Sequence, residues 1–414
     1  MIDLHSSSAM TDIQPALTVE PIAPLVNARA SLKEDAPLRV LHVHSGNLYG
    51  GVETTLMAQV LNRQLCPQMS LSFALCFEDR FSEELYRANA DVTLLGACRI
   101  RNPSSIRRAR NRLRRLLGEA DYDVAVTHSA WSHSLFGLVV QRAGVPLVSW
   151  VHGLVNPKHW LERWASMIPS TMAICNSEFT ATSLRVAYPH LKAAVAYNPL
   201  ISVPNSLPEG RRLDIREALG ISTEKIIITQ VSRMEEGKGQ AVLINGLARL
   251  KEMPNWVCLQ VGGPQRKKEF QYMMDLKTYA ANLGISERVM FIGERSDVPF
   301  LLAASDVLCQ PNTRPETFGN VFIEGMCAGL PVITTAIGGA LEIVNDTCGF
   351  LLPLNDLEAL SSSLRFLIEN PAERKRMGAL GFVHAREISG LEGQMTRISE
   401  LLRGAGVNNR VPVS

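Results

Sequence analysis

The sequence predicts an α/β protein built from two doubly wound, Rossmann-like domains that face a central cleft. Its 414 residues exceed what one ordinary core accommodates. From Leu38 onward, short apolar runs alternate with longer amphipathic segments, which is typical of a parallel sheet wrapped by helices. The alternation pauses once, in a stretch rich in proline around residues 199–210, and then restarts. One pause between two similar series indicates two domains joined by a hinge.

The apolar runs mark the strands of each domain. They are nearly continuous in apolar residues, as expected of strands buried on both faces. We expect strands within residues 38–45, 71–77, 91–95, 122–129, 146–152 and 171–177 of the first series, and within 225–233, 256–263, 288–293, 306–311 and 331–335 of the second. Ligands of such sheets bind at the carboxyl ends of the strands, so function should lie in the loops that follow them.

These runs and the pause divide the chain into five segments. We expect a flexible N-terminal extension, a first domain, a hinge, a second domain, and a C-terminal helix with a tail; a return of that helix to the first domain is one option. Their bounds are 1–37, 38–198, 199–222, 223–388 and 389–414.

Composition excludes several classes of function. Lys and Arg number 42 against 40 Asp and Glu, so the net charge of +2 gives no global reason to bind nucleic acid. The 8 cysteines are scattered and form no C-x-x-C pair, as expected of buried thiols in a reducing compartment. No apolar run approaches the roughly 18 residues of a membrane span, and the N-terminus lacks a secretory signal. We expect a cytoplasmic protein, with peripheral attachment to the inner face of the cell membrane as an option.

The stretch "RPETFGNVFIEGMCAGLPV" predicts an anion site in the second series. A helix over residues 318–329 would begin after Thr317, a suitable N-cap. The backbone N–H groups of Phe318, Gly319 and Asn320 would then lack helical acceptors and favour a phosphate.

Two glutamates flank this anion site at an interval of eight residues. Glu316 precedes the helix and Glu324 lies in its second turn. A carboxylate does not bind an anion, but it accepts hydrogen bonds from neighbouring hydroxyls, such as those of a sugar and a ribose on either side of a diphosphate. The alternative is that both are ordinary surface acids near a helix N-terminus.

The neighbourhood of these glutamates resembles a known family. Together with "AGLPV" and the later Gly338-Gly339 and Glu342, it is similar to the E-x7-E signature of the retaining glycosyltransferases of family 4, also called group 1. The resemblance implies the GT-B fold, with an acceptor-binding first domain and a second domain that binds a nucleotide sugar. It also implies transfer with retention of anomeric configuration, without a divalent metal and without a separate cofactor.

The resemblance also assigns roles in the second domain. "VSRMEEGKG" is similar to the family's Arg-x4-Lys loop, so Arg233 and Lys238 would bind the donor diphosphate and stabilise the charge that grows on it. Glu324 would bind the ribose, whereas Glu316 would hold the hydroxyls of the donor sugar close to the chemistry. The alternative for the two cations is a pair of solvated loop charges.

In the first domain, "GNLYGGVE" and two histidines are candidates. Gly50 and Gly51 resemble a family loop that closes over the donor phosphates. The alternative is a plain strand-to-helix turn, which would have a similar sequence. His152 occupies a strand end where the family has a histidine that contacts the donor sugar. His128, at another strand end, is a candidate for the acceptor side, with a structural role equally open.

One local basic segment stands apart. "RIRNPSSIRRARNRLRRLLG" carries eight arginines, while apolar residues recur at helical spacing, so it predicts a basic amphipathic helix. Either its arginines form a solvated face or they dock on anionic lipid, as in membrane-associated members of the family. The candidates for membrane contact are Arg107, Arg108, Arg110, Arg112, Arg114 and Arg115.

The function expected from these features is sugar transfer from a nucleotide-diphosphate donor, with UDP favoured, to a hydroxyl of a saccharide or lipid-linked acceptor. Two alternatives remain open. An epimerase or phosphorylase acting on nucleotide sugars would use the same phosphate-binding parts, and a non-catalytic scaffold would use only the arginine helix.

Overall fold

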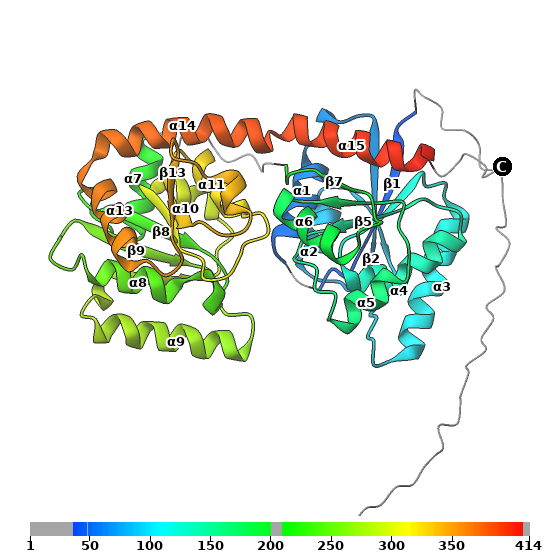
Figure 1. The fold of residues 1–414 in the computed structure, drawn as a ribbon, viewed down its shortest axis with the longest axis horizontal. Coiled ribbons are helices and arrows are strands. Elements are labelled where there is room, and N and C mark those ends of the chain that lie inside the picture. Colours follow the sequence, from blue (N-terminus) through cyan, green and yellow to red (C-terminus); the bar gives the residue numbers. More distant parts are fainter. Residues whose placement is uncertain (1–35, 48, 200–208, 409–414) are drawn as a thin grey trace, which may run out of the picture. The chain divides into compact units, whose positions relative to one another are not determined.

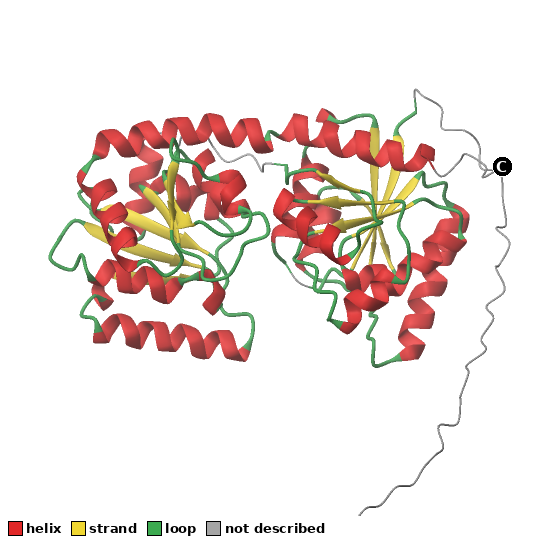
Figure 2. Ribbon diagram, viewed as in Figure 1, coloured by secondary structure: helices red, strands yellow, loops and turns green. Residues whose placement is uncertain are grey.

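The computed structural model describes residues 36–47, 49–199 and 209–408. Within them lie two parallel sheets of seven and six strands, each flanked by helices (Figure 2). This confirms the expected pair of doubly wound domains. The expected N-terminal extension lies outside the described residues except for its last two positions, and so does part of the expected hinge, residues 200–208.

The first domain contains a seven-stranded sheet in the order β3-β2-β1-β4-β5-β6-β7. Every neighbouring pair is parallel. The strands are β1 (Leu38–His44), β2 (Met69–Leu75), β3 (Asp91–Leu94), β4 (Val124–Thr127), β5 (Leu147–Val151), β6 (Met172–Cys175) and β7 (Ala193–Val195). The order reverses between β1 and β4, so the loops after these strands form the switch point at which such sheets bind ligands.

Helices connect these strands. They are α1 (Gly51–Leu61), α2 (Arg80–Arg87), α3 (Pro103–Glu119), α4 (Ala130–Arg142), α5 (Trp160–Ser166) and α6 (Glu178–Ala187), with a short 3₁₀ turn η1 (Arg63–Leu65). One core joins α3 and α4 to one face of the sheet through Leu41, Val43 and Leu113, among others. The opposite face carries Val40, Val126 and Trp150.

The second domain repeats the scheme with six parallel strands in the order β10-β9-β8-β11-β12-β13. The strands are β8 (Ile226–Val231), β9 (Trp256–Val261), β10 (Val289–Gly293), β11 (Val307–Gln310), β12 (Val332–Thr335) and β13 (Gly349–Leu352). The helices and 3₁₀ turns are α7 (Glu209–Ala218), η2 (Glu236–Lys238), α8 (Gln240–Ala248), α9 (Lys267–Asn282), η3 (Ser286–Arg288), α10 (Val298–Ala304), α11 (Asn320–Cys327), α12 (Ala340–Ile343), α13 (Leu357–Glu369) and α14 (Pro371–Ser389). Its switch point lies between β8 and β11.

Two strands, β7 and β13, were not expected from the sequence. Each is short and lies at the edge of its sheet. A strand of three or four residues carries too little apolar pattern to stand out from a loop.

Helix α7 occupies the second half of the expected hinge. Its Arg216 is buried and pairs with Asp306 at 2.6 Å, and Ile215 and Leu219 pack against the core of the second domain. Residues 209–218 are therefore part of the second domain's packing, since a linker helix would have no such buried ion pair.

The C-terminal helix α15 (Leu391–Asn408) packs on the sheet of the first domain (Figure 1). Met395, Ile398 and Leu402 lie in one buried cluster with Val40 and Val126 of β1 and β4. The last described helix thus packs on the domain that contains β1.

Candidate active site

Two loops of the second domain are held together at the carboxyl ends of β8 and β11. Gly239 has a φ of 76°, and a Cβ there would lie 1.9 Å from the carbonyl oxygen of Pro311. Nearby, the Thr313 amide donates to the carbonyl of Gly237 over 3.0 Å. Only glycine permits both this backbone conformation and this approach, so the loop after β8 lies directly against the loop after β11.

This contact brings Lys238 to Glu316. The Lys238 ammonium donates to Oε2 of Glu316, and the two side chains are only 23% and 20% exposed. Arg233, on the same loop, is 44% exposed and pairs with Glu235 over 2.9 Å. Two residues separated by 78 positions, and predicted as neighbours of one diphosphate, therefore meet at one point in the structure.

The glycine pair that follows β12 allows Glu316 to sit there. Gly338 has a φ of 67°, and a Cβ on it would lie 2.3 Å from the carbonyl oxygen of Glu316. The Gly339 amide donates to that same carbonyl over 2.7 Å. The pair thus serves as a backbone support for the loop that carries Glu316.

Helix α11 begins later than the sequence suggested. Its first residue is Asn320 and its N-cap is Gly319, with a φ of 103°, so the expected start at residue 318 with a Thr317 cap is wrong. Thr317 instead donates its hydroxyl to the carbonyl of His152 over 2.9 Å. Since glycine adopts a positive φ without strain, the chain turns into the helix at Gly319. The amides of Gly319, Asn320 and Val321 have no acceptor among the described residues, so the set of free N–H groups lies one residue later than expected, and the anion site there stays a prediction.

Glu324 lies one turn into α11 and is partly buried. Within the described part of the chain its carboxylate accepts no hydrogen bond, and burial raises its pKa to about 7. It lines a small hollow together with Thr55, Asn198, Phe318 and Asn320. A desolvated carboxylate without donors is an acceptor available to the hydroxyls of a ligand.

In the first domain, Glu53 anchors the glycine loop at the start of α1. One carboxylate oxygen accepts from the Gly50 amide at 2.8 Å, and the other meets Nε2 of His44 at 2.6 Å. A Cβ on Gly51 would lie 3.2 Å from the Asn320 side-chain amide, which donates to the Gly51 carbonyl at 3.4 Å. The Glu53 carboxylate therefore fixes the loop, and the loop backbone lies next to the N-terminus of α11.

The strand order places a row of histidines on one face of the first sheet. His42 of β1 is in register with Val126 of β4, which is in register with Val148 of β5. Because side chains alternate along a strand, His128 and His152 lie on the same face as His42. The rings stack in sequence, with centroids 5.0 Å apart between His42 and His128 and 5.3 Å apart between His128 and His152.

Hydrogen bonds connect these rings. Nδ1 of His42 lies 2.8 Å from Nε2 of His128, and Nδ1 of His128 lies 3.0 Å from Nε2 of His152. Burial lowers the pKa of His42 and of His152 to about 3, and that of His128 well below its usual value. All three imidazoles are therefore neutral at physiological pH.

The position of His128 corrects an expectation. Its side chain is 2% exposed and lies beneath His152, which is itself partly exposed. Burial to this degree leaves no surface for a direct contact between His128 and an acceptor.

The sequence did not single out His42, and it offered Glu342 only as part of the family signature, without its contact to α6. His42 carried a weak signal, as a polar residue two positions before His44 in an otherwise apolar strand. Glu342 accepts from the amides of Glu178 and Phe179 at 2.8 and 2.7 Å, and so caps α6. Only the tertiary structure reveals that cap, because 163 and 164 positions separate the partners.

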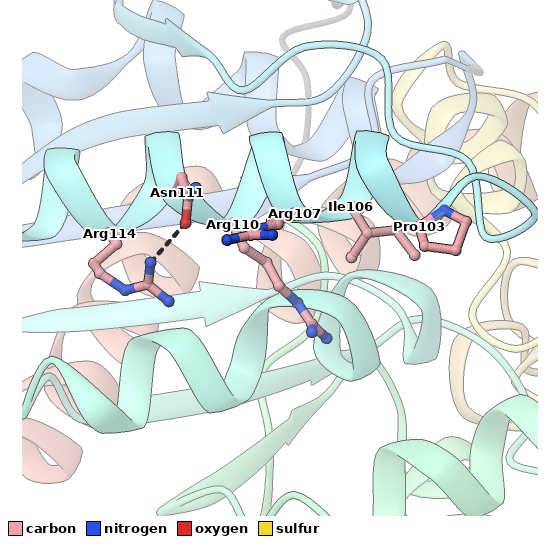
Figure 3. Close-up of a pocket in the computed structure, with 6 residues that line it drawn as sticks. All are labelled: Pro103, Ile106, Arg107, Arg110, Asn111 and Arg114. Carbon is pink, nitrogen blue, oxygen red and sulfur yellow. Dashed lines mark hydrogen bonds between the residues drawn. The ribbon is translucent and has the colours of Figure 1, made fainter.

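The basic amphipathic helix exists as α3. Ala109, Leu113 and Leu117 are buried on its inner side, whereas Arg107, Arg108, Arg112, Arg114 and Arg115 are exposed. Arg110 is an exception, since its Nε donates to the carbonyl of Leu135 in α4 over 2.6 Å. Figure 3 shows this side chain directed from α3 toward the neighbouring helix, with Arg114 bonded to Asn111. Arg110 therefore joins two helices, and the expectation that it faces a membrane is wrong.

Metal-binding clusters and membrane-spanning helices are both absent from the described residues. No cluster of three or more His, Cys, Asp or Glu side chains in residues 36–47, 49–199 and 209–408 is placed to hold a metal ion. Nor does any helix in these ranges have the length and apolarity to cross a membrane.

Comparison with known proteins decides the family. The model for glycosyl transferases group 1 matches residues 211–382, and the model for glycosyltransferase family 4 matches residues 49–200. Together they span both domains. The chain belongs to the group 1 glycosyltransferases of family 4. It is therefore an enzyme that transfers a sugar from a nucleotide-sugar donor.

Curated relatives of this glycosyltransferase act on different substrates. It is 26% identical to a GDP-mannose-dependent alpha-(1-6)-phosphatidylinositol monomannoside mannosyltransferase of Mycolicibacterium smegmatis, over 71% of the chain and 80% of the relative. It is also 26% identical to a UDP-Gal:alpha-D-GlcNAc-diphosphoundecaprenol alpha-1,3-galactosyltransferase of Escherichia coli, over 61% and 68%. One of these names specifies a GDP sugar and the other a UDP sugar.

Solved structures confirm the GT-B fold. Anabaena HepE, crystallised with UDP and glucose, aligns with a TM-score of 0.78 at 22% identity, over 89% of this chain and all of HepE. A glycosyltransferase from Rickettsia africae aligns with a TM-score of 0.79 at 22% identity, over 90% and 99%.

Proposed function

We propose that this glycosyltransferase transfers its sugar with retention of configuration, without a divalent metal, to a hydroxyl of a saccharide or lipid-linked acceptor. The proposal rests on one observation: at the carboxyl end of the second sheet, Lys238 pairs with Glu316 on the loop that leads into α11, whose first three amides have no acceptor among the described residues. In this arrangement Arg233, Lys238 and the amides at Gly319 bind the diphosphate, whereas Glu324 accepts from the ribose hydroxyls.

Glu316 and Lys238 act as one unit in this mechanism. Their side chains form an ion pair in the structure. A bound diphosphate would give Lys238 a second anionic partner. Glu316 can then accept hydrogen bonds from hydroxyls of the donor sugar while Lys238 holds the Glu316 carboxylate in place. His152, at the end of β5, contacts the same sugar from the first domain.

The reaction we propose takes place on one face of the sugar. The acceptor oxygen bonds to the anomeric carbon as the bond from that carbon to the phosphate oxygen breaks, and the leaving phosphate takes the acceptor proton. Arg233 and Lys238 stabilise the negative charge that grows on the phosphate, since they are already in place and need no reorganisation. They supply this charge without a metal ion. Uridine is our choice of base, and UDP-galactose in the name of the Escherichia coli relative supports it.

Thermal shift with a panel of UDP, GDP and ADP sugars tests the donor. Binding stabilises by RT ln(1 + [L]/Kd), so the true donor should raise the melting temperature, with a shift that grows with the logarithm of [L]/Kd. Lys238→Met and Glu316→Gln should retain the fold but lose about 10²- to 10³-fold in kcat with that donor. A flat panel, or normal transfer by both variants, would contradict the proposal.

We also propose that α3 docks on anionic membrane from the cytoplasmic side, where a lipid-linked acceptor would lie. Five exposed arginines on one helix are worth about 1 kcal/mol each near such a surface. Flotation with vesicles containing anionic lipid should show binding that weakens as salt rises. Replacing Arg107, Arg108 and Arg112 together with Gln should abolish it. Salt-independent binding, or none at low salt, would refute the docking.

A further inference from the structure

The histidine row of the first domain contains more groups than sugar binding needs. His152 alone is exposed enough to contact a ligand, whereas His42 and His128 are 0% and 2% exposed. Burying polar rings costs free energy unless their nitrogens are hydrogen-bonded, and apolar residues would pack at these positions at lower cost. The two buried rings are nonetheless arranged in line with His152 by hydrogen bonds of 2.8 and 3.0 Å.

Each bond in this chain needs one proton, and each neutral imidazole has one N–H. If His128 carries its proton on Nδ1, it donates to Nε2 of His152, whose own proton must then be on Nδ1. If His128 carries its proton on Nε2, every bond reverses, and His152 presents a bare Nδ1 to the site. The proton position on His128 therefore sets the chemical character of His152.

His42, at the buried end of the row of hydrogen-bonded histidines, decides between these two states. Nε2 of His42 is buried and has no hydrogen-bond partner among the described residues. In the reversed state this atom would carry a buried N–H without an acceptor, and orphaned N–H groups are rarer in proteins than orphaned acceptors. The other state leaves a bare nitrogen there and places all three protons toward His152. Phe73, stacked on His42 at 5.2 Å between centroids, is in keeping with an apolar environment at this end.

At the open end, Nδ1 of His152 is free to contact a ligand. No hydrogen-bond partner for this atom exists among the described residues, and it is not one of the buried unpaired atoms. The ring orientation is fixed by stacking on Trp150, with centroids 5.5 Å apart and planes at 16°. A fixed ring with a defined tautomer is a directional hydrogen-bond donor.

We propose that His42 and His128 are positioning residues, which hold His152 in the tautomer protonated at Nδ1 so that it donates a hydrogen bond to a hydroxyl oxygen of the donor sugar. The inference rests on the proposed function, because it needs a sugar beside His152. In this hydrogen bond the hydroxyl oxygen of the sugar accepts from His152. The proton of the same hydroxyl therefore remains free to be donated to a carboxylate.

The ring nitrogens can be observed directly. In the full chain labelled with ¹⁵N-histidine, long-range ¹H–¹⁵N spectra separate protonated from bare nitrogens, and His152→Asn assigns the signals. We expect wild-type His152 to carry its proton on Nδ1 and His128→Phe, which keeps an aromatic ring but removes both bonds, to lose that preference. His133→Phe is the matched control, because His133 is also buried but bonds Thr127 and Ile168 instead. An Nε2 proton on wild-type His152, or no change in His128→Phe, would overturn the inference.

A second pair of variants covers the case in which His128→Phe does not fold. His42→Asn retains a side-chain N–H near the position of Nδ1, whereas His42→Leu has none. We expect His152 to keep its proton on Nδ1 in the His42→Asn variant and to lose that preference in the His42→Leu variant. Equal spectra for the two variants would count against the inference.

Kinetics connect the tautomer to catalysis. We expect kcat/KM to fall about tenfold to a hundredfold in His128→Phe and His42→Leu, by analogy with the range found when a partner that orients a metal-bound imidazole is removed. The affinity of His128→Phe and His42→Leu for UDP should stay unchanged, and so should the activity of His133→Phe. If the wild-type protein transfers no sugar, the proposed function fails, and the spectra alone still decide the tautomer. If it transfers sugar and both variants match it, the inference fails while the proposed function stands.

Discussion

Replacing Glu324 with Gln should stabilise the protein at pH 8 and weaken nucleotide binding. Burial raises the pKa of this carboxyl from 4.5 to about 7, a shift of about 2.5 pH units. One unit corresponds to about 1.36 kcal/mol, so the folded state loses on the order of 3 kcal/mol when the carboxylate ionises. The neutral amide avoids this cost because it carries no charge to desolvate.

The sign of the pH dependence follows from the same shift. Between pH 4.5 and 7 the folded protein binds a proton at Glu324 that the unfolded chain has released. Its contribution to stability is therefore present below pH 4.5 and is lost as the pH rises through about 7. The stability difference between Glu324→Gln and wild type should thus be small at pH 4.5 and grow to its full value by pH 8.

Urea unfolding at pH 4.5, 6, 7 and 8 measures this difference. Glu252→Gln, at an exposed glutamate of the same domain, is the control and should change stability by less than about 0.5 kcal/mol at every pH. UDP titrations at pH 8 should show weaker binding to Glu324→Gln, because a carboxylate is lost as acceptor for the ribose. A variant no more stable at pH 8 than at pH 4.5, relative to wild type, would refute the reasoning.

Two further predictions concern stability. Gly319→Ala should cost about 2 to 5 kcal/mol in urea unfolding, from strain at a φ of 103° and a Cβ 2.4 Å from the Phe322 ring. Gly329→Ala, with a φ of 73° but no atom within 4 Å of its Cβ, should cost only about 1 to 2 kcal/mol, and equal losses would show that crowding has no effect. Arg110→Met should lower stability by about 1 to 3 kcal/mol, since it removes the charge-assisted hydrogen bond from Nε to the Leu135 carbonyl. The exposed Arg108→Met should change it by less than about 0.5 kcal/mol in the same thermal melts, and a reversed order would refute the role of Arg110.

Much of the fold was available from local sequence. Buried parallel strands are nearly continuous apolar runs, so eleven of the thirteen strands stood out, whereas the short edge strands β7 and β13 did not. The amphipathic pattern of residues 103–119 likewise predicted α3, because burial of one helix face leaves a period in the sequence.

Interactions between distant residues were decided by tertiary structure alone. The motif identified Lys238 and Glu316 separately, but only the packing of Gly239 on Pro311 brings them into one ion pair. Likewise, Arg110 looked like any other arginine of α3 until α4 supplied a carbonyl to bind.

The sequence by itself determined that this protein has two doubly wound domains, that it belongs to the family 4 glycosyltransferases, and where its candidate residues lie along the chain. The tertiary structure decided which of those residues meet. It shifted the start of α11 to Asn320, buried His128, and aligned His42 with His152. The physical reason is that apolar periodicity is a local property of a chain, whereas hydrogen bonds across neighbouring parallel strands depend on strand order and register, which no local pattern encodes.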